Sequence, residues 1–426
     1  MEILILLGSL FLFLIARLPI AFALGISATV TAMYMGIPAI VIAQKMVEGV
    51  KSFSLMAIPF FIIAGEIMGQ GGISKRLIDF SNVIIGRVRG GLAMVNILSS
   101  MFFGGISGSS VADTSSIGTI MIPMMEKEGY DKDYAVNVTI TSSTQGVIVP
   151  PSHNMIIYSV AAGGLSVGKL FLGGIVPGVL LGLTLMALSY WIAVKRDYPK
   201  GEKISMARAK VIIRESFLGL MTAVIIMGGV VSGIFTATES AAIAAIYAFV
   251  ITYFVYRDVP LSNFIVVLRN SLKTLAMVMA VIATSSAFGY MMAMLKVPQL
   301  ITNFILDFSD NRIVILILIN VILLVLGMIM DMAPLILITT PILIPVITKI
   351  GMDPIQFGII MMLNLGIGLL TPPVGSTLFV GCSIADISIE KIAKSLKPFY
   401  IMLFLYLMAI TFIPAITVWL PGVILG

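Results

Sequence analysis

The stretch Leu92–Met124 reads LAMVNILSSMFFGGISGSSVADTSSIGTIMIPM, an apolar segment with a polar, glycine-rich break at Gly104–Ser116. The apolar flanks, Leu92–Phe103 and Ile117–Met124, are each shorter than the roughly 20 residues that cross a bilayer. A backbone turn at membrane depth is tolerated only where protein or a water-filled cavity satisfies its polar groups. The pattern therefore favours a re-entrant helical hairpin over a kinked full-length helix.

A second break of this kind lies at Gly327–Pro334, and the two breaks belong to an internal repeat. Each half reads as an apolar segment ending in Ile-Pro, a charged turn, a further helix and a Pro-Pro break. The residues that align at an offset of 222 are Ile122-Pro123 with Ile344-Pro345, Lys127 with Lys349, Gly129 with Gly351, Asp131 with Asp353, Gly146 with Gly368, and Pro150-Pro151 with Pro372-Pro373. Matching interruptions in two halves are typical of transporters built from structural repeats. The repeat indicates duplication and leaves open whether one copy is inverted.

The Pro-Pro breaks, Gly146–Ser152 and Gly368–Thr377, are candidate ion sites. Two consecutive prolines remove two amide donors and free the carbonyl groups one turn earlier. Freed carbonyls and nearby hydroxyls suit a dehydrated monovalent cation, and half-helix amide ends suit a carboxylate. A Pro-Pro pair that only kinks a packed helix is the simpler explanation for one break, but not for two at equal spacing behind polar hairpins.

The composition places the whole chain in a membrane. Of 426 residues, 59% are hydrophobic and 11% are charged, with a mean hydropathy of +1.12. This length allows on the order of ten to twelve helical crossings with short connections. We therefore expect an all-α polytopic protein in which residues 1–426 form one membrane domain. The net charge of +6 fits the cation excess of short cytoplasmic loops, so we reject nucleic-acid binding.

Charge also predicts the organisation along the chain. The stretch 195–214 is rich in Lys and Arg and is the expected cytoplasmic loop between the halves. It separates a first repeat core at 92–160 from a second at 312–385, each a hairpin followed by a broken helix. Segments 73–91 and 257–273 carry cations on partly apolar faces, which suits helices along the membrane interface.

The N-terminus has the pattern of a retained helix. Glu2 precedes the apolar stretch Ile3–Ala16 and Arg17 follows it, without a basic front end or a small-residue cleavage site. The same charge bias places the N-terminus outside the cytoplasm.

Five carboxylates lie in apolar sequence, where a charge is costly and suggests function: Glu66, Asp113, Glu239, Asp331 and Asp386. Asp113 and Asp331 occupy comparable places in the two hairpins and rank first, as groups that bind an ion or lock a hairpin. A helix N-cap is an equally good interpretation of Asp113. Glu239 resembles the first turn of a helix, and Glu66 is interpreted as a helix contact.

The chemistry that remains is sparse. His153 is the one histidine and Cys382 the one cysteine, which excludes a histidine-rich metal site and a disulfide framework. Ser152 and His153 are adjacent in sequence, which does not establish the orientation that a nucleophile and its base require. No glycine-rich loop followed by Lys-Ser or Lys-Thr is present, so a gradient must drive transport. We expect a transporter rather than an enzyme, without a cofactor other than coupling ions.

With these features the sequence resembles the large membrane subunit of the tripartite ATP-independent periplasmic (TRAP) transporters over essentially its whole length. The resemblance rests on Arg17–Gly25, Ile58–Met68, Gly108–Asp113, Thr236–Ala242 and Thr371–Gly375. It implies about 11 transmembrane helices with two opposed re-entrant hairpins. It also implies an elevator mechanism, in which a transport domain moves against a scaffold domain.

The resemblance further implies sodium-coupled import of an organic acid, such as a C4-dicarboxylate or sialic acid, across the bacterial inner membrane. Partners would be a separate small four-helix membrane subunit and a periplasmic substrate-binding protein. Carried over by position, one sodium site comprises Ser107, Ser109, Gly146, Val149 and Pro151. The repeat-related sodium site comprises Gly327, Asp331, Gly368, Thr371 and Pro373. Substrate would lie near Ser142, Ser143 and Asp331. The alternative is a stand-alone sodium- or proton-coupled organic-anion transporter with two hairpins.

Overall fold

The computed structural model describes residues 1–201 and 203–426 of the chain, which are 81% helical and form no strand. The helices of the first half are α1 (Glu2–Ile15), α2 (Ile20–Tyr34), α3 (Ala39–Val50), η1 (Phe53–Met56), α4 (Ala57–Gln70), α5 (Ile73–Ile85), α6 (Gly91–Ser107), α7 (Ser110–Lys127), α8 (Lys132–Ser142), α9 (Gln145–Ile148), α10 (His153–Ala161) and α11 (Val167–Lys195). Those of the second half are α12 (Met206–Val231), α13 (Ala237–Val250), η2 (Ile251–Tyr256), η3 (Leu261–Asn263), α14 (Phe264–Met294), α15 (Val297–Phe308), α16 (Arg312–Gly327), α17 (Met332–Lys349), α18 (Pro354–Gly368), α19 (Ser376–Ala385), α20 (Ile389–Ser395), α21 (Lys397–Phe412) and α22 (Ala415–Leu425).

The helices confirm an all-α polytopic membrane protein. In the described part of the chain, six helices are long and apolar enough to cross a bilayer. A seventh is added if α20 and α21, which meet at 58°, count as one span. The longest are α14 and α11, with 31 and 29 residues. Seven further apolar helices are only 10–17 residues long, so much of the apolar sequence is divided into segments shorter than a full crossing.

The two halves repeat helix by helix. In the first half, α6 and α7 form a helical hairpin around the turn Gly108–Ser109; in the second, α16 and α17 are joined through Met328–Asp331. The starts of α7 and α17 are 222 residues apart, as are their ends and the starts of α8 and α18. The expected offset is therefore confirmed at the level of helix boundaries.

One detail of the predicted repeat is wrong. The Ile-Pro pairs do not end the apolar segments, because Pro123 lies inside α7 and Pro345 inside α17. Both helices continue to a lysine, Lys127 or Lys349, and end there. A proline inside a helix removes one hydrogen bond and bends the axis, but neighbouring helices can hold the bent helix in place.

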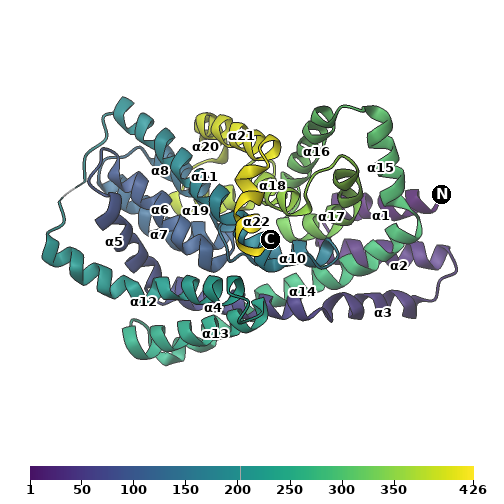
Figure 1. Ribbon diagram of the computed structural model, residues 1–426, viewed down its shortest axis with the longest axis horizontal. Helices are drawn as coiled ribbons and strands as arrows, with labels where there is room; N and C mark the ends of the chain where they lie inside the picture. Colours follow the sequence, from purple (N-terminus) through teal and green to yellow (C-terminus); the bar gives the residue numbers. More distant parts are fainter. Residues whose placement is uncertain (202) are drawn as a thin grey trace.

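The broken helices lie at the centre of the molecule. Every residue of α8 from Tyr134 to Ser142 is buried, as is every residue of α18 from Ile355 to Gly368. After the Pro-Pro breaks the chain crosses to the other repeat: α10 packs against α17, and α19 packs against α7 and α8. Each repeat thus completes the packing of the other, and α19 lies among helices α6, α7 and α11 of the first half in Figure 1.

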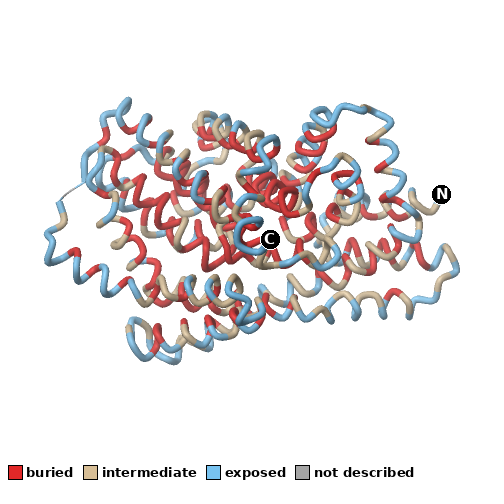
Figure 2. The backbone as a smooth tube through the Cα atoms, viewed as in Figure 1, coloured by how far each residue is buried: buried red, intermediate tan, exposed pale blue. Residues whose placement is uncertain are grey.

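A row of helices lies along one long side of these repeats. In Figure 1, α12, α4, α14 and α3 follow one another along the lower edge, with α13 beside α4. Figure 2 shows buried backbone concentrated in the repeats, whereas the row is largely exposed or intermediate. Segment 73–91 contains helix α5, and segment 257–273 contains η3 and the first turns of the long helix α14, residues 264–273. Their expected position along the membrane interface stays a prediction.

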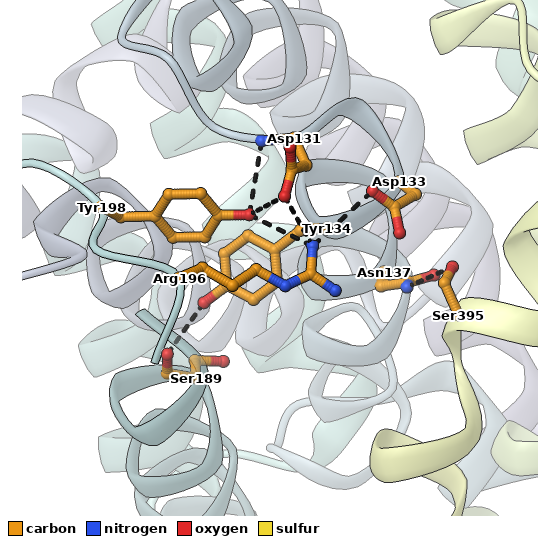
Figure 3. Close-up of polar contacts among 8 residues, drawn as sticks. All are labelled: Asp131, Asp133, Tyr134, Asn137, Ser189, Arg196, Tyr198 and Ser395. Atoms are coloured by element: carbon orange, nitrogen blue, oxygen red, sulfur yellow. Dashed lines mark hydrogen bonds and ion pairs between the residues drawn. The ribbon is translucent and has the colours of Figure 1, made fainter. Parts of the chain in front are cut away.

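The connection after α11 is anchored to the base of the first repeat (Figure 3). Arg196 Nη1 and the Tyr198 hydroxyl each donate to Asp131 Oδ2 at 2.7 Å, and Tyr134 donates to the Ser189 carbonyl at 2.9 Å. These contacts hold the turn between α7 and α8 against the end of α11. The hydrogen bond from Tyr198, together with Arg196, lowers the pKa of Asp131. Burial and the hydrogen bond to Asp131 raise the pKa of Tyr198 to about 12.

Candidate functional site

The first hairpin touches the first broken helix through glycines. A Cβ atom on Gly104 would lie 2.4 Å from Gly146 Cα, so the two backbones are in direct contact. A Cβ on Gly105 would lie 3.0 Å from the Pro150 carbonyl oxygen, and one on Gly146 would lie 3.6 Å from the Ser109 carbonyl oxygen. The tip of α6 and the start of α7 therefore pass directly over the Pro-Pro break.

This contact brings together the members of the first expected ion site. Ser107 and Ser109 flank the hairpin turn, and the Ser107 hydroxyl accepts from the Ser109 amide at 3.4 Å. Gly146 lies in α9, just before the break. In a continuous helix the Gly146 carbonyl would accept from Pro150, which has no amide hydrogen. We call Ser107, Ser109, Gly146, Val149 and Pro151 the first cluster.

The second repeat contains the same glycine contact. A Cβ on Gly368 would lie 2.7 Å from Gly327 Cα. The Val374 amide donates to the Met328 carbonyl at 3.1 Å, which ties the break to the hairpin turn. The Gly368 carbonyl lies one helical turn before Pro372, as the Gly146 carbonyl lies before Pro150. We call Gly327, Asp331, Gly368, Thr371 and Pro373 the second cluster.

In the described part of the chain, the side chains of Asp331 and Thr371 make no hydrogen bond to the other members of the second cluster. The Asp331 side chain is exposed and does not cap α17, although Asp331 occupies the N-cap position. The Thr371 hydroxyl donates to the Ile367 carbonyl of its own helix at 2.8 Å. The structure thus brings Gly327 and Gly368 together, but among the described residues the Asp331 side chain makes no hydrogen bond to either of them.

The residues expected near substrate are also dispersed. Ser142 and Ser143 are fully buried at the end of α8. Ser142 donates to Ser100 Oγ at 3.0 Å, and the hydroxyls of Ser143 and Ser110 are 2.7 Å apart. Asp331 belongs to the other hairpin and is exposed. In this conformation the three residues do not share one open surface.

Asp113 is the most unusual charged group of the first hairpin. It is fully buried, and neither carboxylate oxygen accepts a hydrogen bond from the described residues within 3.5 Å. Ser100 is a polar neighbour of this carboxylate. The alternative interpretation of Asp113 as a helix N-cap is wrong, because Ser109 caps α7 and accepts from the Ala112 amide at 3.3 Å. A buried carboxylate without partners is costly and needs a proton or a cation.

Of the remaining candidates, Glu66 and Glu239 have structural partners, whereas Asp386 is exposed. Glu66 Oε1 accepts from Gln70 at 2.5 Å and from Asn270 at 3.0 Å, which joins α4 to α14 as expected of a helix contact. Glu239 forms a capping box with Thr236 at the start of α13. Asp386 is exposed at the end of α19. His153 begins α10 beside the Gly108 turn.

Sequence reasoning missed two hydroxyls between the repeats. Ser110 Oγ lies 3.1 Å from Thr377 Oγ1, and both side chains are buried. The sequence did show that Ser110 and Thr377 each lie in the first turn of a helix that follows a break. Their contact became visible only when the crossing of α19 onto α7 placed the two turns together.

Taken together, the geometry is that of a membrane transporter: two repeats, each with a helical hairpin pressed against a helix broken at membrane depth, interlock around a buried centre. The chain belongs to the DctM component family of the tripartite ATP-independent periplasmic transporters, whose family pattern matches residues 7–416. It is therefore the large permease of a TRAP transporter, a multi-pass inner-membrane protein and not an enzyme.

Two relatives illustrate this membership, and one solved structure shares the fold. The isethionate TRAP transporter permease protein DctMQ of Oleidesulfovibrio alaskensis is 40% identical over 98% of this chain and 66% of its own length. The sialic acid TRAP transporter large permease protein SiaM of Vibrio cholerae is 38% identical over 90% of each chain. The crystal structure of the YdaH transporter of Alcanivorax borkumensis matches 86% of each chain with a TM-score of 0.62 at 11% identity, which is a likeness of fold.

Proposed function

We propose that this chain is the large permease of a sodium-coupled importer of an organic acid. The observation that carries the proposal is the paired glycine contact, Gly104 on Gly146 and Gly327 on Gly368. In each repeat it places a hairpin turn against a Pro-Pro break. In the first repeat the Gly146 carbonyl loses the amide partner that a residue other than Pro150 would supply, whereas in the second the Gly368 carbonyl accepts from the Thr371 amide at 2.9 Å. Carbonyl and hydroxyl oxygens at membrane depth are the ligands that unwound helices offer to sodium.

The first cluster is the better-formed sodium site. It combines the hydroxyls of Ser107 and Ser109 with the carbonyl freed at Gly146, in a region where these groups are buried or half-buried. The second cluster completes its shell in another conformation, in which Asp331 turns toward Gly368. Such a change is what an elevator motion of the repeats against the row of helices would require.

The substrate is an organic acid with at least one anionic group. Half-helix amide ends at the two hairpin turns provide the positive field for this group. The printed names of the two relatives, one for isethionate and one for sialic acid, support the class of organic anions. A C4-dicarboxylate or a sugar acid therefore heads the list of compounds to test.

Two partners complete the transporter. Family membership supports a small membrane subunit and a periplasmic substrate-binding protein. The row of helices offers the apolar surface that a membrane subunit requires: α14 buries only 22% of its most apolar window within this chain, and α12 buries 28%. We propose the small four-helix subunit as the occupant of part of this surface.

The test is uptake of labelled organic acids into proteoliposomes that contain this chain and its small subunit, with the binding protein outside. An inward sodium gradient is compared with an inward proton gradient and with potassium in place of sodium. We expect accumulation only with sodium and binding protein together. Ser109→Ala should raise the sodium concentration needed for half-maximal uptake, whereas Ser232→Ala, in the exposed turn after α12, is the matched control.

The alternative outcomes are distinct. Uptake without the binding protein would favour the stand-alone organic-anion transporter. Accumulation driven by protons, and unchanged when potassium replaces sodium, would reject both sodium clusters.

A further inference from the structure

Three hydroxyl groups meet where the two repeats touch. Ser110 Oγ lies 2.7 Å from Ser143 Oγ and 3.1 Å from Thr377 Oγ1. Ser110 begins α7 and Ser143 follows α8 in the first repeat, whereas Thr377 lies in the first turn of α19 in the second. Ser110 is 1% exposed, and Ser143 and Thr377 are fully buried. We call these three residues the hydroxyl bridge.

One end of the hydroxyl bridge is attached to the first cluster. The Ser143 carbonyl accepts from the Gly146 amide at 3.0 Å, so Ser143 holds the glycine that contacts the hairpin. Ser110 directly follows Ser109, whose carbonyl lies beside Gly146. A shift of the backbone around the first cluster must therefore move Ser110 or Ser143.

The other end is attached to the second cluster. The Leu378 amide, one residue after Thr377, donates to the Leu369 carbonyl at 3.3 Å. Leu369 in turn follows Gly368, the glycine of the second hairpin contact. A continuous series of contacts thus runs from Gly146 to Gly368 through three buried hydroxyls.

The pseudo-equivalent place in the other half contains no hydroxyl. At the 222-residue offset, Ser110, Ser143 and Thr377 correspond to Met332, Leu365 and Met155, all of which are buried in the core. Apolar side chains are therefore sufficient to fill the space at the repeat-related contact. Burying a hydroxyl costs free energy unless it is hydrogen-bonded, so polar contact at only one of the two crossings indicates a role other than filling space.

We propose that the hydroxyl bridge couples the two sodium clusters, so that sodium at one cluster raises the affinity of the other. The inference rests on the proposed sodium coupling and adds to it a source of cooperativity. Sodium at the first cluster fixes the backbone from Ser107 to Gly146, and the contact between Ser110 and Thr377 extends that order to the start of α19. Because thermodynamic coupling is reciprocal, sodium at the second cluster must favour the first equally. Ser110, Ser143 and Thr377 are positioning residues that do not themselves bind the ion.

The test is a sodium titration of uptake with wild type, Ser110→Ala, Thr377→Val and the double variant. For wild type we expect a Hill coefficient above one. Each single variant should lower it toward about one, and a tenfold loss of coupling would raise the half-saturating sodium concentration about threefold. The double variant should match the single ones, because either substitution already breaks the same contact. Thr377→Ser retains the hydroxyl and should restore the wild-type curve.

A control and a second readout separate coupling from stability. Thr340 is fully buried in α17, and its hydroxyl contacts only the Met361 sulfur, at 3.6 Å, so Thr340→Val is the matched control and should leave the Hill coefficient unchanged. The sodium-dependent rise in unfolding temperature of the purified protein gives the same titration without transport. A variant could lower the unfolding temperature equally in sodium and in potassium and keep the wild-type steepness of the sodium titration. This result would reject coupling and would assign the hydroxyl bridge a packing role only.

Other outcomes also decide the matter. If the single effects add in the double variant, Ser110 and Thr377 act separately and the bridge is rejected. If wild type shows no sodium dependence, the proposed sodium coupling itself fails and the bridge fails with it. If wild type depends on sodium but none of the bridge variants changes the steepness, sodium coupling stands and only the bridge is rejected.

Discussion

The carboxylate of Asp113 is the residue whose burial most needs an explanation. Asp113→Asn keeps the shape of the side chain and removes its charge. If the carboxylate balances a bound cation, sodium-driven uptake should fall about tenfold or more, which corresponds to a loss of roughly 1.4 kcal/mol in ion binding. The unfolding temperature should stay the same or rise, because an unpaired buried carboxylate is destabilising.

Asp386→Asn is the matched control for this experiment, because Asp386 is exposed at the end of α19. It should leave both uptake and unfolding temperature unchanged. Full uptake by Asp113→Asn, measured in the same proteoliposomes, would remove Asp113 from the transport cycle.

The glycine contacts give a second prediction at this scale. Gly104→Ala places a methyl group 2.4 Å from Gly146 Cα, and neither backbone can move without displacing the hairpin. We expect a loss of about 1–3 kcal/mol in the free energy of unfolding, as is typical of overpacking. Gly289→Ala in α14 has no atom within 4 Å of the added Cβ and should be neutral or slightly stabilising. Thermal unfolding in detergent compares the two variants. Equal stability would show that the backbone around Gly104 and Gly146 adjusts to the added methyl group without loss of stability.

At the scale of the helix, the sequence predicted breaks better than it predicted crossings. Glycine and proline act through local backbone geometry, so the break that contains the Gly108 turn and both Pro-Pro breaks could be located from the positions of these residues in the sequence. The offset of 222 then fixed which helices correspond. The sequence did not show that residues 264–273 begin the long helix α14, because the scattered cations at its start hide the continuity with the apolar residues that follow.

Contacts between distant helices were beyond reach for a physical reason. The hydroxyl bridge depends on α19 crossing to α7, and a single sequence does not show which helices are in contact. The partners of Glu66 were hidden for the same reason, since Asn270 lies 204 residues away. Periodicity and propensity are local signals, whereas these contacts are set by tertiary packing.

The turn between α7 and α8 makes a prediction about pH. The pKa of Asp131 is lowered in the folded protein, so its contribution to stability is fully present above its unfolded pKa of about 4. That contribution is lost as the pH falls through the lower, folded value. Asp131→Asn should therefore be less stable than wild type at pH 7, and the difference should shrink as the pH falls below about 4. Unfolding temperatures at a series of pH values measure it, and a constant difference would show that the carboxylate charge is not involved.

At the scale of the molecule, the repeats and the row of helices have different surroundings. The repeats bury their central helices α8 and α18 almost completely, whereas only 28% of the apolar window of α12 and 22% of that of α14 are buried within this chain. The repeats have a buried centre and the row of helices is largely exposed, as a moving domain beside a fixed domain would require. In the proposed elevator mechanism, the row would be the frame against which the repeats move.

This frame must have a fixed orientation, which leads to the last prediction. Helix α12 has 26 residues and is about 39 Å long at 1.5 Å per residue, which is enough to cross a bilayer, so we expect its ends on opposite sides. The cation-rich stretch 195–214 precedes and includes its start and should be cytoplasmic, which puts the turn after Val231 in the periplasm. In a Cys382→Ser background, a membrane-impermeant maleimide should label Ser232→Cys in intact spheroplasts. Lys203→Cys should react only after permeabilisation, and the reverse pattern would invert the protein in the membrane and move every periplasmic contact proposed for it to the other face.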